Sequence, residues 1–336
     1  MTYIINLKEE LAKSDYDVEY QELCLNYANF LISNGLPVIF DKKHLSLLMG
    51  INFSSLNYYV INTDHFYQEY KIPKKNGEFR LVLAPSFNLK SIQKWILENI
   101  LYNYQVSENA TGFVKGKSIL DNALPHVAKD VVFNLDIKDF FPSVTFKQVF
   151  YIFYNKGYTK EISFTLTKLL TYKETLPQGS PASPYIANII CKRMDQFLEN
   201  LAKTHNANYT RYADDITFSG DTNIENIINP IRSIINNEGF TINEKKVRIQ
   251  NRNSMQEVTG LTVNNAVKVK RKYKKKLEQH IYYCQKHGVF SHLKYTGLEN
   301  KSYFKEYLYG MANFIKMIEP DVGNRYIDSL NEIIWN

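Results

Sequence analysis

Cysteine is scarce in this sequence, since only Cys24, Cys191 and Cys284 occur among 336 residues. Their wide separation excludes a disulfide framework, and no two of them have the close spacing of a structural zinc site. The sequence therefore indicates isolated thiols in a reducing compartment, and argues against a disulfide-stabilised secreted domain or a zinc module.

Long apolar runs are also missing, because no stretch approaches the roughly 18 residues that cross a bilayer. The N-terminal segment becomes charged at Lys8, so it lacks the apolar stretch of a secretory signal. The hydrophobic fraction of 44% excludes a disordered chain. We expect a cytoplasmic protein with about two domains or one elaborated domain, and no membrane partner.

Positive charge is concentrated in residues 267–286, whose excess of basic over acidic residues equals the net charge of the whole chain, +7. Tyr273, Tyr282 and Tyr283 are interleaved with the lysines. Three interpretations stay open for this segment: a solvated helix face, a helix along a phosphate backbone, or a helix at a membrane surface. The lack of a broad apolar face disfavours the membrane interpretation.

The order of elements predicts an α+β fold. Turn signals and β-prone residues predict hairpins in residues 66–84 and 208–219, and a nearly continuous apolar strand in 131–137. A further strand is expected to begin near Gly239. Helices are expected in the segments 7–33, 89–102, 146–170, 184–201, 223–237 and 303–334. This order is typical of a split βαβ unit, an antiparallel sheet with helices on one face.

Three aspartates lie at the ends of these strands. Asp136 is near the end of the apolar strand, and Asp214 and Asp215 occupy the tip of the second hairpin. If both elements belong to one sheet, the carboxylates converge, repel one another and need a cation. Hard oxygen ligands select Mg²⁺, and two such ions support phosphoryl transfer. The alternative is that each aspartate merely caps a turn.

Four ordered blocks around these aspartates resemble the reverse transcriptases. The blocks are Asp136 with Phe140–Pro142, Leu176–Pro181, Tyr212–Asp215, and Gly239–Asn243 with Lys246. They are similar to the first catalytic strand, the nucleotide-holding loop, the catalytic Tyr-x-Asp-Asp box and the segment after it. The resemblance implies an RNA-directed DNA polymerase with a right-hand fold of fingers, a palm built on an antiparallel sheet, and a small helical thumb.

The resemblance also implies roles for individual residues. Catalysis and the binding of two Mg²⁺ ions are expected of Asp136, Asp214 and Asp215, with the backbone carbonyl of Ile137 as a further metal ligand. Nucleotide contacts are expected of Lys75, Arg80, Phe141, Gln178, Gly179, Ala213 and Lys246. Within this set, Phe141 would exclude a ribose 2′-hydroxyl, Arg80 would bind the triphosphate and Lys246 would give a proton to pyrophosphate. Phe140 is expected in the core.

The same resemblance divides the chain into parts. These are an N-terminal helical region (1–65), fingers (66–130), a palm (131–265, with finger helices inserted around 145–175) and a thumb (266–336). The basic segment then becomes the thumb surface that grips nucleic acid, with RNA contacts expected at Lys270, Arg271, Lys274 and Lys275. The thumb leaves no room for an RNase H domain of about 100–150 residues. We therefore expect a separate host RNase H to act on the product.

Two further motifs resemble the retron subfamily of these enzymes. Asn122 and His126 form its N-A-x-x-H box, and Val258, Thr259 and Gly260 form its V-T-G box. The resemblance implies that these residues recognise a cognate noncoding RNA. It also implies priming from the 2′-hydroxyl of an internal RNA guanosine and incorporation of dNTPs into single-stranded DNA. The product is a 2′–5′ branched RNA–DNA molecule (msDNA), which acts in anti-phage defence beside an effector protein.

Two alternatives remain at this level. One is another bacterial reverse transcriptase, of the abortive-infection or diversity-generating type, which needs no 2′-primed branch. The other is a non-catalytic palm scaffold that only binds nucleic acid. The three intact aspartates argue against the scaffold, because a scaffold has no need for adjacent unneutralised carboxylates.

Overall fold

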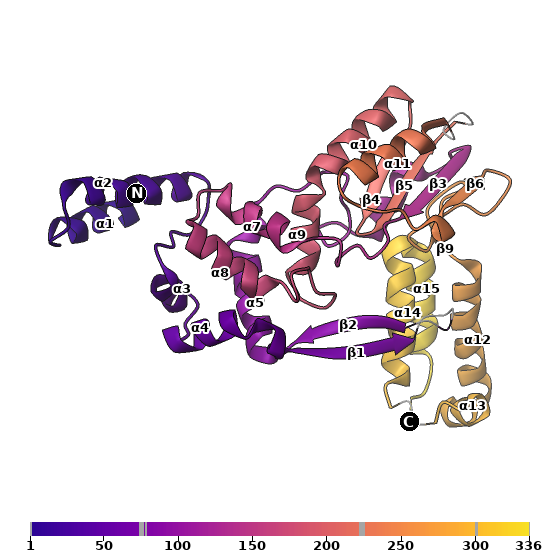
Figure 1. Ribbon diagram of the computed structural model, residues 1–336. Coiled ribbons are helices and arrows are strands. Elements are labelled where there is room, and N and C mark those ends of the chain that lie inside the picture. Colours follow the sequence, from indigo (N-terminus) through magenta and orange to yellow (C-terminus); the bar gives the residue numbers. More distant parts are fainter. Residues whose placement is uncertain (1, 74–76, 78, 222–225, 300–301, 336) are drawn as a thin grey trace. The chain divides into compact units, whose positions relative to one another are not determined.

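The computed structural model describes residues 2–73, 77, 79–221, 226–299 and 302–335. The chain forms two compact units, each assembled from separate segments (Figure 1). The first unit contains Met1–Val114, Ile137–Asn200 and Pro230–Asn243. The second contains Lys115–Asp136, Leu201–Asn229 and Glu244–Asn336. In the described ranges, no helix is both long and apolar enough to cross a bilayer.

The first unit is mainly helical. Its helices are α1 (Thr2–Ala12), α2 (Val18–Ser33), α3 (Lys42–Leu48), α4 (Phe53–Ile61), α5 (Phe87–Asn99), α7 (Phe146–Tyr154), α8 (Lys160–Leu170) and α9 (Ser183–Ile190). A short 3₁₀ helix, η1 (Thr63–Phe66), leads into the antiparallel ribbon of β1 (Tyr67–Pro73) and β2 (Phe79–Pro85). This ribbon is the hairpin predicted over residues 66–84. Helices α10 (Lys192–Thr204) and α11 (Ile228–Asn237) each continue from one unit into the other.

The second unit is built on a four-stranded antiparallel sheet with the order β4-β5-β3-β6. Its strands are β3 (Val131–Asp136), β4 (Asn208–Tyr212), β5 (Asp215–Gly220) and β6 (Arg248–Asn251). In Figure 1, β3 lies among strands that come from much later in the chain. Five of the six β3 residues are buried, which explains why its sequence is nearly continuously apolar rather than alternating.

A second, three-stranded sheet follows in the same unit, with the order β7-β8-β9. Its short strands are β7 (Glu257–Val258), β8 (Leu261–Thr262) and β9 (Lys268–Val269). Helices α6 (Ile119–Ala123), α12 (Arg271–His287), α13 (Val289–Thr296), α14 (Phe304–Ile318) and α15 (Pro320–Asn331) complete the unit. One buried cluster joins Ala123 of α6 and Val132 of β3 to the β7–β9 sheet and to α12, α14 and α15. Val132 of the four-stranded sheet therefore belongs to the hydrophobic core of the C-terminal helices.

Several expectations from the sequence need correction. The helix expected over residues 7–33 is two helices, α1 and α2, and the one expected over 184–201 is divided at Cys191 into α9 and α10. The strand expected to begin near Gly239 does not form. Ile242 makes only an isolated β-bridge with Ile137, and the edge strand β6 starts at Arg248. The two units are each assembled from several of the expected parts, and the division into an N-terminal region, fingers, palm and thumb stays a prediction.

Candidate active site

The sheet brings the three aspartates to one end of the second unit. Antiparallel pairing places Asp136, the last residue of β3, opposite Asp215, the first residue of β5. Directly opposed residues of an antiparallel pair have Cα atoms about 4.5–5.5 Å apart. Asp214 lies in the turn between β4 and β5, next to this pair. The convergence expected from the sequence is therefore confirmed, and it follows from backbone register.

The turn that carries Asp214 is tight and has an unusual backbone. Tyr212 pairs with Asp215, so the connection has only two residues, Ala213 and Asp214. Ala213 has a φ of 56°, in the left-handed region that an L-residue adopts at a cost. The guanidinium of Arg211, which is fully buried, donates a 3.0 Å hydrogen bond to the carbonyl oxygen of Ala213. A buried arginine thus holds the backbone of the aspartate turn, a role that the sequence alone did not reveal.

Acidic and basic side chains meet at this end of the sheet. The ammonium of Lys246 lies 2.6 Å from Oδ2 of Asp136, whose side chain is buried. Asp215 keeps some solvent exposure, but its partial withdrawal from water and the charges of Asp214 and Asp136 raise its pKa to about 6. The positive charges of Lys246 and Arg248 act in the opposite direction and do not cancel this rise.

The donor set fits a divalent cation by its chemistry. Carboxylates are hard oxygen ligands, and a cation relieves the repulsion that raises the pKa of Asp215. Across the described part of the chain, no three His, Cys, Asp or Glu side chains already converge as metal ligands. The aspartates are thus gathered at one end of the sheet, with Lys246 on Asp136, and they do not form a closed ligand set.

In the first unit, the expected nucleotide loop is attached to the β1–β2 ribbon. The backbone N–H of Leu83 in β2 donates a 2.8 Å hydrogen bond to the carbonyl of Gln178. Gly179 has a φ of 144°, and a Cβ there would lie 2.4 Å from the carbonyl oxygen of Leu83. Only glycine fits this approach. The close backbone contact at Gly179 is with β2.

The other expected nucleotide residues are found in different settings. Arg80 is exposed on β2, opposite Ile72 of β1. Phe140 is buried, and its ring centroid lies 5.4 Å from that of Phe141 and 5.9 Å from that of Phe240. Phe141 is partly exposed. Phe140 is therefore a core residue, as the sequence suggested. Lys75 lies outside the described residues.

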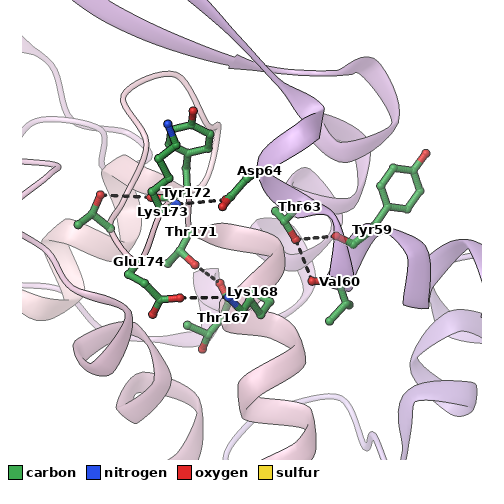
Figure 2. A network of polar contacts seen from close by, with 11 residues as sticks. Tyr59, Val60, Thr63, Asp64, Thr167, Lys168, Thr171, Tyr172, Lys173 and Glu174 are labelled. Atoms are coloured by element: carbon green, nitrogen blue, oxygen red, sulfur yellow. Dashed lines mark hydrogen bonds and ion pairs between the residues drawn. The ribbon is translucent and has the colours of Figure 1, made fainter.

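A strained turn precedes the nucleotide loop (Figure 2). Tyr172 and Thr175 exchange two backbone hydrogen bonds, so the turn residues are Lys173 and Glu174, with φ values of 45° and 64°. Such a turn normally contains Asn and Gly. Its backbone is held by the carboxylate of Asp64 in η1, which accepts a 3.1 Å bond from the N–H of Lys173, and Lys168 pairs with Glu174 at 3.0 Å. These two contacts therefore hold the backbone in place just before it enters the nucleotide loop, Leu176–Pro181.

Comparison with known proteins decides the family. Residues 72–284 match the family model of reverse transcriptases (RNA-dependent DNA polymerases). The retron Ec86 reverse transcriptase of Escherichia coli is 38% identical over 269 residues, which cover 77% of this chain and 83% of that protein. This chain belongs to the retron reverse transcriptases. Two Myxococcus xanthus relatives, the retron Mx65 and Mx162 enzymes, are each 33% identical and cover 87% and 90% of this chain, which spans 71% and 68% of their lengths.

This retron reverse transcriptase is therefore an RNA-directed DNA polymerase with the right-hand polymerase fold, and its partners are nucleic acids. Reverse transcriptases use divalent metal ions, in agreement with the donor chemistry of Asp136, Asp214 and Asp215. The antiparallel pairing of the apolar strand with the second hairpin, which carries these aspartates, agrees with the sheet predicted from the sequence, whereas its edge strand β6 does not.

Asn122 and His126, expected to contact RNA, are fully buried. The two ring nitrogens of His126 lie 2.6 Å from Ser219 Oγ on β5 and 2.8 Å from Thr210 Oγ1 on β4. Since Thr210 donates its own proton to the carbonyl of Asn122, the Nε2 of His126 is the protonated nitrogen, and Nδ1 accepts from Ser219. His126 thereby ties together the two strands whose turn carries Asp214. In this structure neither side chain is accessible to RNA.

The V-T-G box lies beside the N-A-x-x-H box. The amide of Asn122 donates a 3.4 Å hydrogen bond to Thr259 Oγ1, and Thr259 in turn donates to the carbonyl of Ile119. Val258 is fully buried in the core shared with the C-terminal helices, and Gly260 is exposed in the turn between β7 and β8. The two boxes thus contact each other across 137 residues of sequence and form internal structure.

The basic residues of the C-terminal helices fall into two groups. Lys270 pairs with Glu257 at 2.5 Å, and Lys274 pairs with Glu319 at 3.0 Å, in a contact that leaves both side chains less than one-fifth exposed. By contrast, Arg271 and Lys275 are exposed on α12. Lys270 and Lys274 therefore have internal ion pairs and Arg271 and Lys275 face solvent, while the RNA contacts expected of all four stay a prediction.

Burial of His126 predicts a pH dependence of stability. Burial lowers the pKa of the folded-state imidazole to about 3, below the 6.5 of an exposed histidine. Between these values the unfolded state binds the extra proton, so the free energy of unfolding decreases as the pH falls below 6.5, by up to about 1.4 kcal/mol per pH unit.

Urea unfolding of wild type and His126→Gln between pH 7 and pH 5 measures this pH dependence. The variant should lose less stability than wild type, whereas the exposed control His205→Gln should follow wild type. Parallel profiles for all three would contradict the assignment.

Close contact at Gly179 predicts a steric penalty for any side chain there. We expect Gly179→Ala to lower the free energy of unfolding by on the order of 1–3 kcal/mol, because its Cβ meets a backbone carbonyl that cannot move aside. Gly50→Ala is the matched control, since Gly50 also has a positive φ, of 68°, but has open space around its Cβ position. Thermal unfolding should show a larger loss for Gly179→Ala; equal losses would show that only backbone strain matters.

Proposed function

We propose that this retron reverse transcriptase binds its own structured noncoding RNA and copies part of it into single-stranded DNA. Synthesis starts from the 2′-hydroxyl of an internal guanosine and leaves a 2′–5′ branched RNA–DNA product, msDNA. The observation that carries the proposal is the placement of Asp136 opposite Asp215, with Asp214 in the adjoining turn. The likeness to several retron enzymes supports the priming chemistry.

In this proposal Asp136, Asp214, Asp215 and the backbone carbonyl of Ile137 hold two Mg²⁺ ions. Bound there, the ions supply positive charge for the attacking hydroxyl and the leaving pyrophosphate. Lys246, which lies at Asp136, is placed to give a proton to a leaving group at the aspartates. Ala213 contributes through its backbone, held by Arg211.

The first unit is proposed to supply the nucleotide contacts, and thus to correspond to the fingers. Arg80 binds the triphosphate as a planar guanidinium, with Lys75 as a second cation. Gln178 and Gly179 present the loop against the base and sugar, and Phe141 lies under the sugar. The four-stranded sheet and the C-terminal helices correspond to palm and thumb.

Recognition of the cognate RNA is proposed to depend indirectly on the two retron boxes. Asn122, His126, Val258 and Thr259 fix the position of neighbouring surface segments, and Gly260 lies in an exposed turn. A host RNase H that removes the copied RNA, and an effector protein in anti-phage defence, complete the proposed system.

The function is tested with the purified protein, its noncoding RNA, Mg²⁺ and labelled dNTPs, without a primer. We expect DNA that stays joined to RNA until a debranching enzyme cleaves the 2′–5′ bond. Asp214→Asn, which keeps the size of the side chain, should bind the RNA but make no DNA. If DNA is made only from an added conventional primer, the proposed priming from an RNA 2′-hydroxyl is wrong. If no DNA is made under either condition, the protein is a non-catalytic scaffold that binds nucleic acid.

Phe141 is predicted to control sugar selection. Because the proposed gate excludes a 2′-hydroxyl by contact with the ring, Phe141→Ala should allow ribonucleotides to compete with deoxyribonucleotides. The ratio of kcat/KM for dNTP over rNTP should fall by about 10-fold or more, as expected when a steric contact of 1–3 kcal/mol is lost. Phe140→Leu is the core control and should keep the ratio even if stability falls. Unchanged discrimination in Phe141→Ala would remove Phe141 from the gate.

Exposed cations of α12 are predicted to bind phosphate. Replacing Arg271, Lys272 and Lys275 with Gln should weaken binding to a template–primer duplex and reduce the slope of log K against log salt by up to about 0.9 per lost contact. The matched control is Lys274→Gln, which breaks the internal pair with Glu319 and should lower stability with little change in slope. An unchanged slope in the triple variant would show that these residues of α12 face solvent and do not bind phosphate.

A further inference from the structure

Helix α7 has an aromatic face that the proposed catalytic roles do not use. Phe146, Phe150 and Tyr154 follow one another at four-residue intervals, so they share one side of the helix, and Tyr151 lies beside them. The opposite side of α7 is buried through Val149, Ile152 and Phe153. Tyr151 and Tyr154 are 43% and 39% exposed, and Phe146 and Phe150 are partly exposed. We call the four residues Phe146, Phe150, Tyr151 and Tyr154 the α7 aromatic face.

Three rings of this face, those of Phe150, Tyr151 and Tyr154, contact one another. Phe150 and Tyr154 stack with centroids 5.5 Å apart and an angle of 21° between planes, and Tyr151 contacts both rings edge-on. The helix that carries them has a firm start, because Thr145 and Gln148 form a reciprocal capping box. The aromatic rings are therefore presented from a rigid element rather than from a loop.

Along α7 and the turns on either side of it, the charged residues are lysines. From Phe140 to Lys160 there is no Asp or Glu, whereas Lys147, Lys156 and Lys160 are all exposed. Lys168 of α8 lies over the ring of Phe146 at 5.4 Å and also pairs with Glu174 at 3.0 Å, so one carboxylate lies at this end of the face. Exposed aromatic rings beside lysines are the composition that binds single strands, because bases stack on the rings and lysines bind the phosphates.

We propose that the α7 aromatic face binds a single-stranded segment of RNA. The bases of a duplex are already stacked on one another, so a surface of side-chain rings favours unpaired bases. RNA is the strand that a reverse transcriptase holds before synthesis begins, and the hydroxyls of Tyr151 and Tyr154 can hydrogen-bond its 2′-hydroxyls. The proposal rests on the RNA-dependent activity of the family but not on any role proposed for the aspartates or the nucleotide loop.

Binding is tested by fluorescence anisotropy with a labelled single-stranded oligouridylate and the full-length protein. The double variant Phe150→Leu/Tyr154→Leu keeps apolar side chains but removes the stacking rings. We expect its Kd to rise by about 10-fold or more, in line with the loss of stacking by one or two bases. Tyr58→Leu, at a tyrosine of α4 that is 60% exposed, is the matched control and should bind as wild type.

A second variant avoids any change to ring packing. Lys147→Gln/Lys156→Gln should lower the slope of log K against log salt by about 0.7 per lost phosphate contact for a single strand. Extension of an oligodeoxythymidylate primer on polyriboadenylate should be unchanged in both double variants, which separates this proposal from the catalytic one. Wild-type oligouridylate affinity in both variants, as expected if the face binds a protein instead, would overturn it. Wild-type affinity for oligodeoxythymidylate equal to that for oligouridylate would overturn its assignment to RNA.

Discussion

Opposed carboxylates at the paired ends of β3 and β5 are the constraint on which the active end of this enzyme depends. Asp136 and Asp215 face each other because the register of an antiparallel pair leaves no other position for them. Partial withdrawal from water, together with the charges of Asp214 and Asp136, raises the pKa of Asp215 to about 6. The surrounding structure must hold these groups together against the repulsion of their charges. It does so with a buried central strand, an ion pair to Lys246 and a turn fastened by Arg211.

The features that distinguish retron enzymes lie in this supporting structure. His126 joins β4 to β5 behind the aspartate turn, and Asn122 joins the same region to the V-T-G box through Thr259. Val258 then belongs to the core shared with α12, α14 and α15. A polar network that is both buried and satisfied specifies one arrangement of its elements. Backbone strain is found at Ala213, Lys173 and Glu174, close in sequence to the proposed catalytic and nucleotide residues, as is common where geometry must be held.

Much of this was predictable from local pattern. The apolar strand, the two hairpins and the order of the motif blocks follow from residue type and spacing, and they place the aspartates together. Contacts between distant segments were not predictable: the 109-residue separation between Asp64 and Lys173 leaves no local signal, nor does the pairing of Lys274 with Glu319. The retron boxes were interpreted as RNA contacts because they distinguish the retron subfamily. Burial, which no single sequence reveals, makes Asn122 and His126 internal supports.

We propose that the aspartates are held in mutual repulsion until a divalent cation binds. Thermal unfolding of wild type and Asp215→Asn, with EDTA or with Mg²⁺ and no nucleotide, tests it most directly. Since the variant removes one of the repelling charges, we predict that Asp215→Asn is more stable than wild type in EDTA. Mg²⁺ should then raise the Tm of wild type more than that of the variant, because binding to the folded state stabilises it. A variant less stable than wild type in EDTA, together with no effect of Mg²⁺ on either protein, would contradict the account.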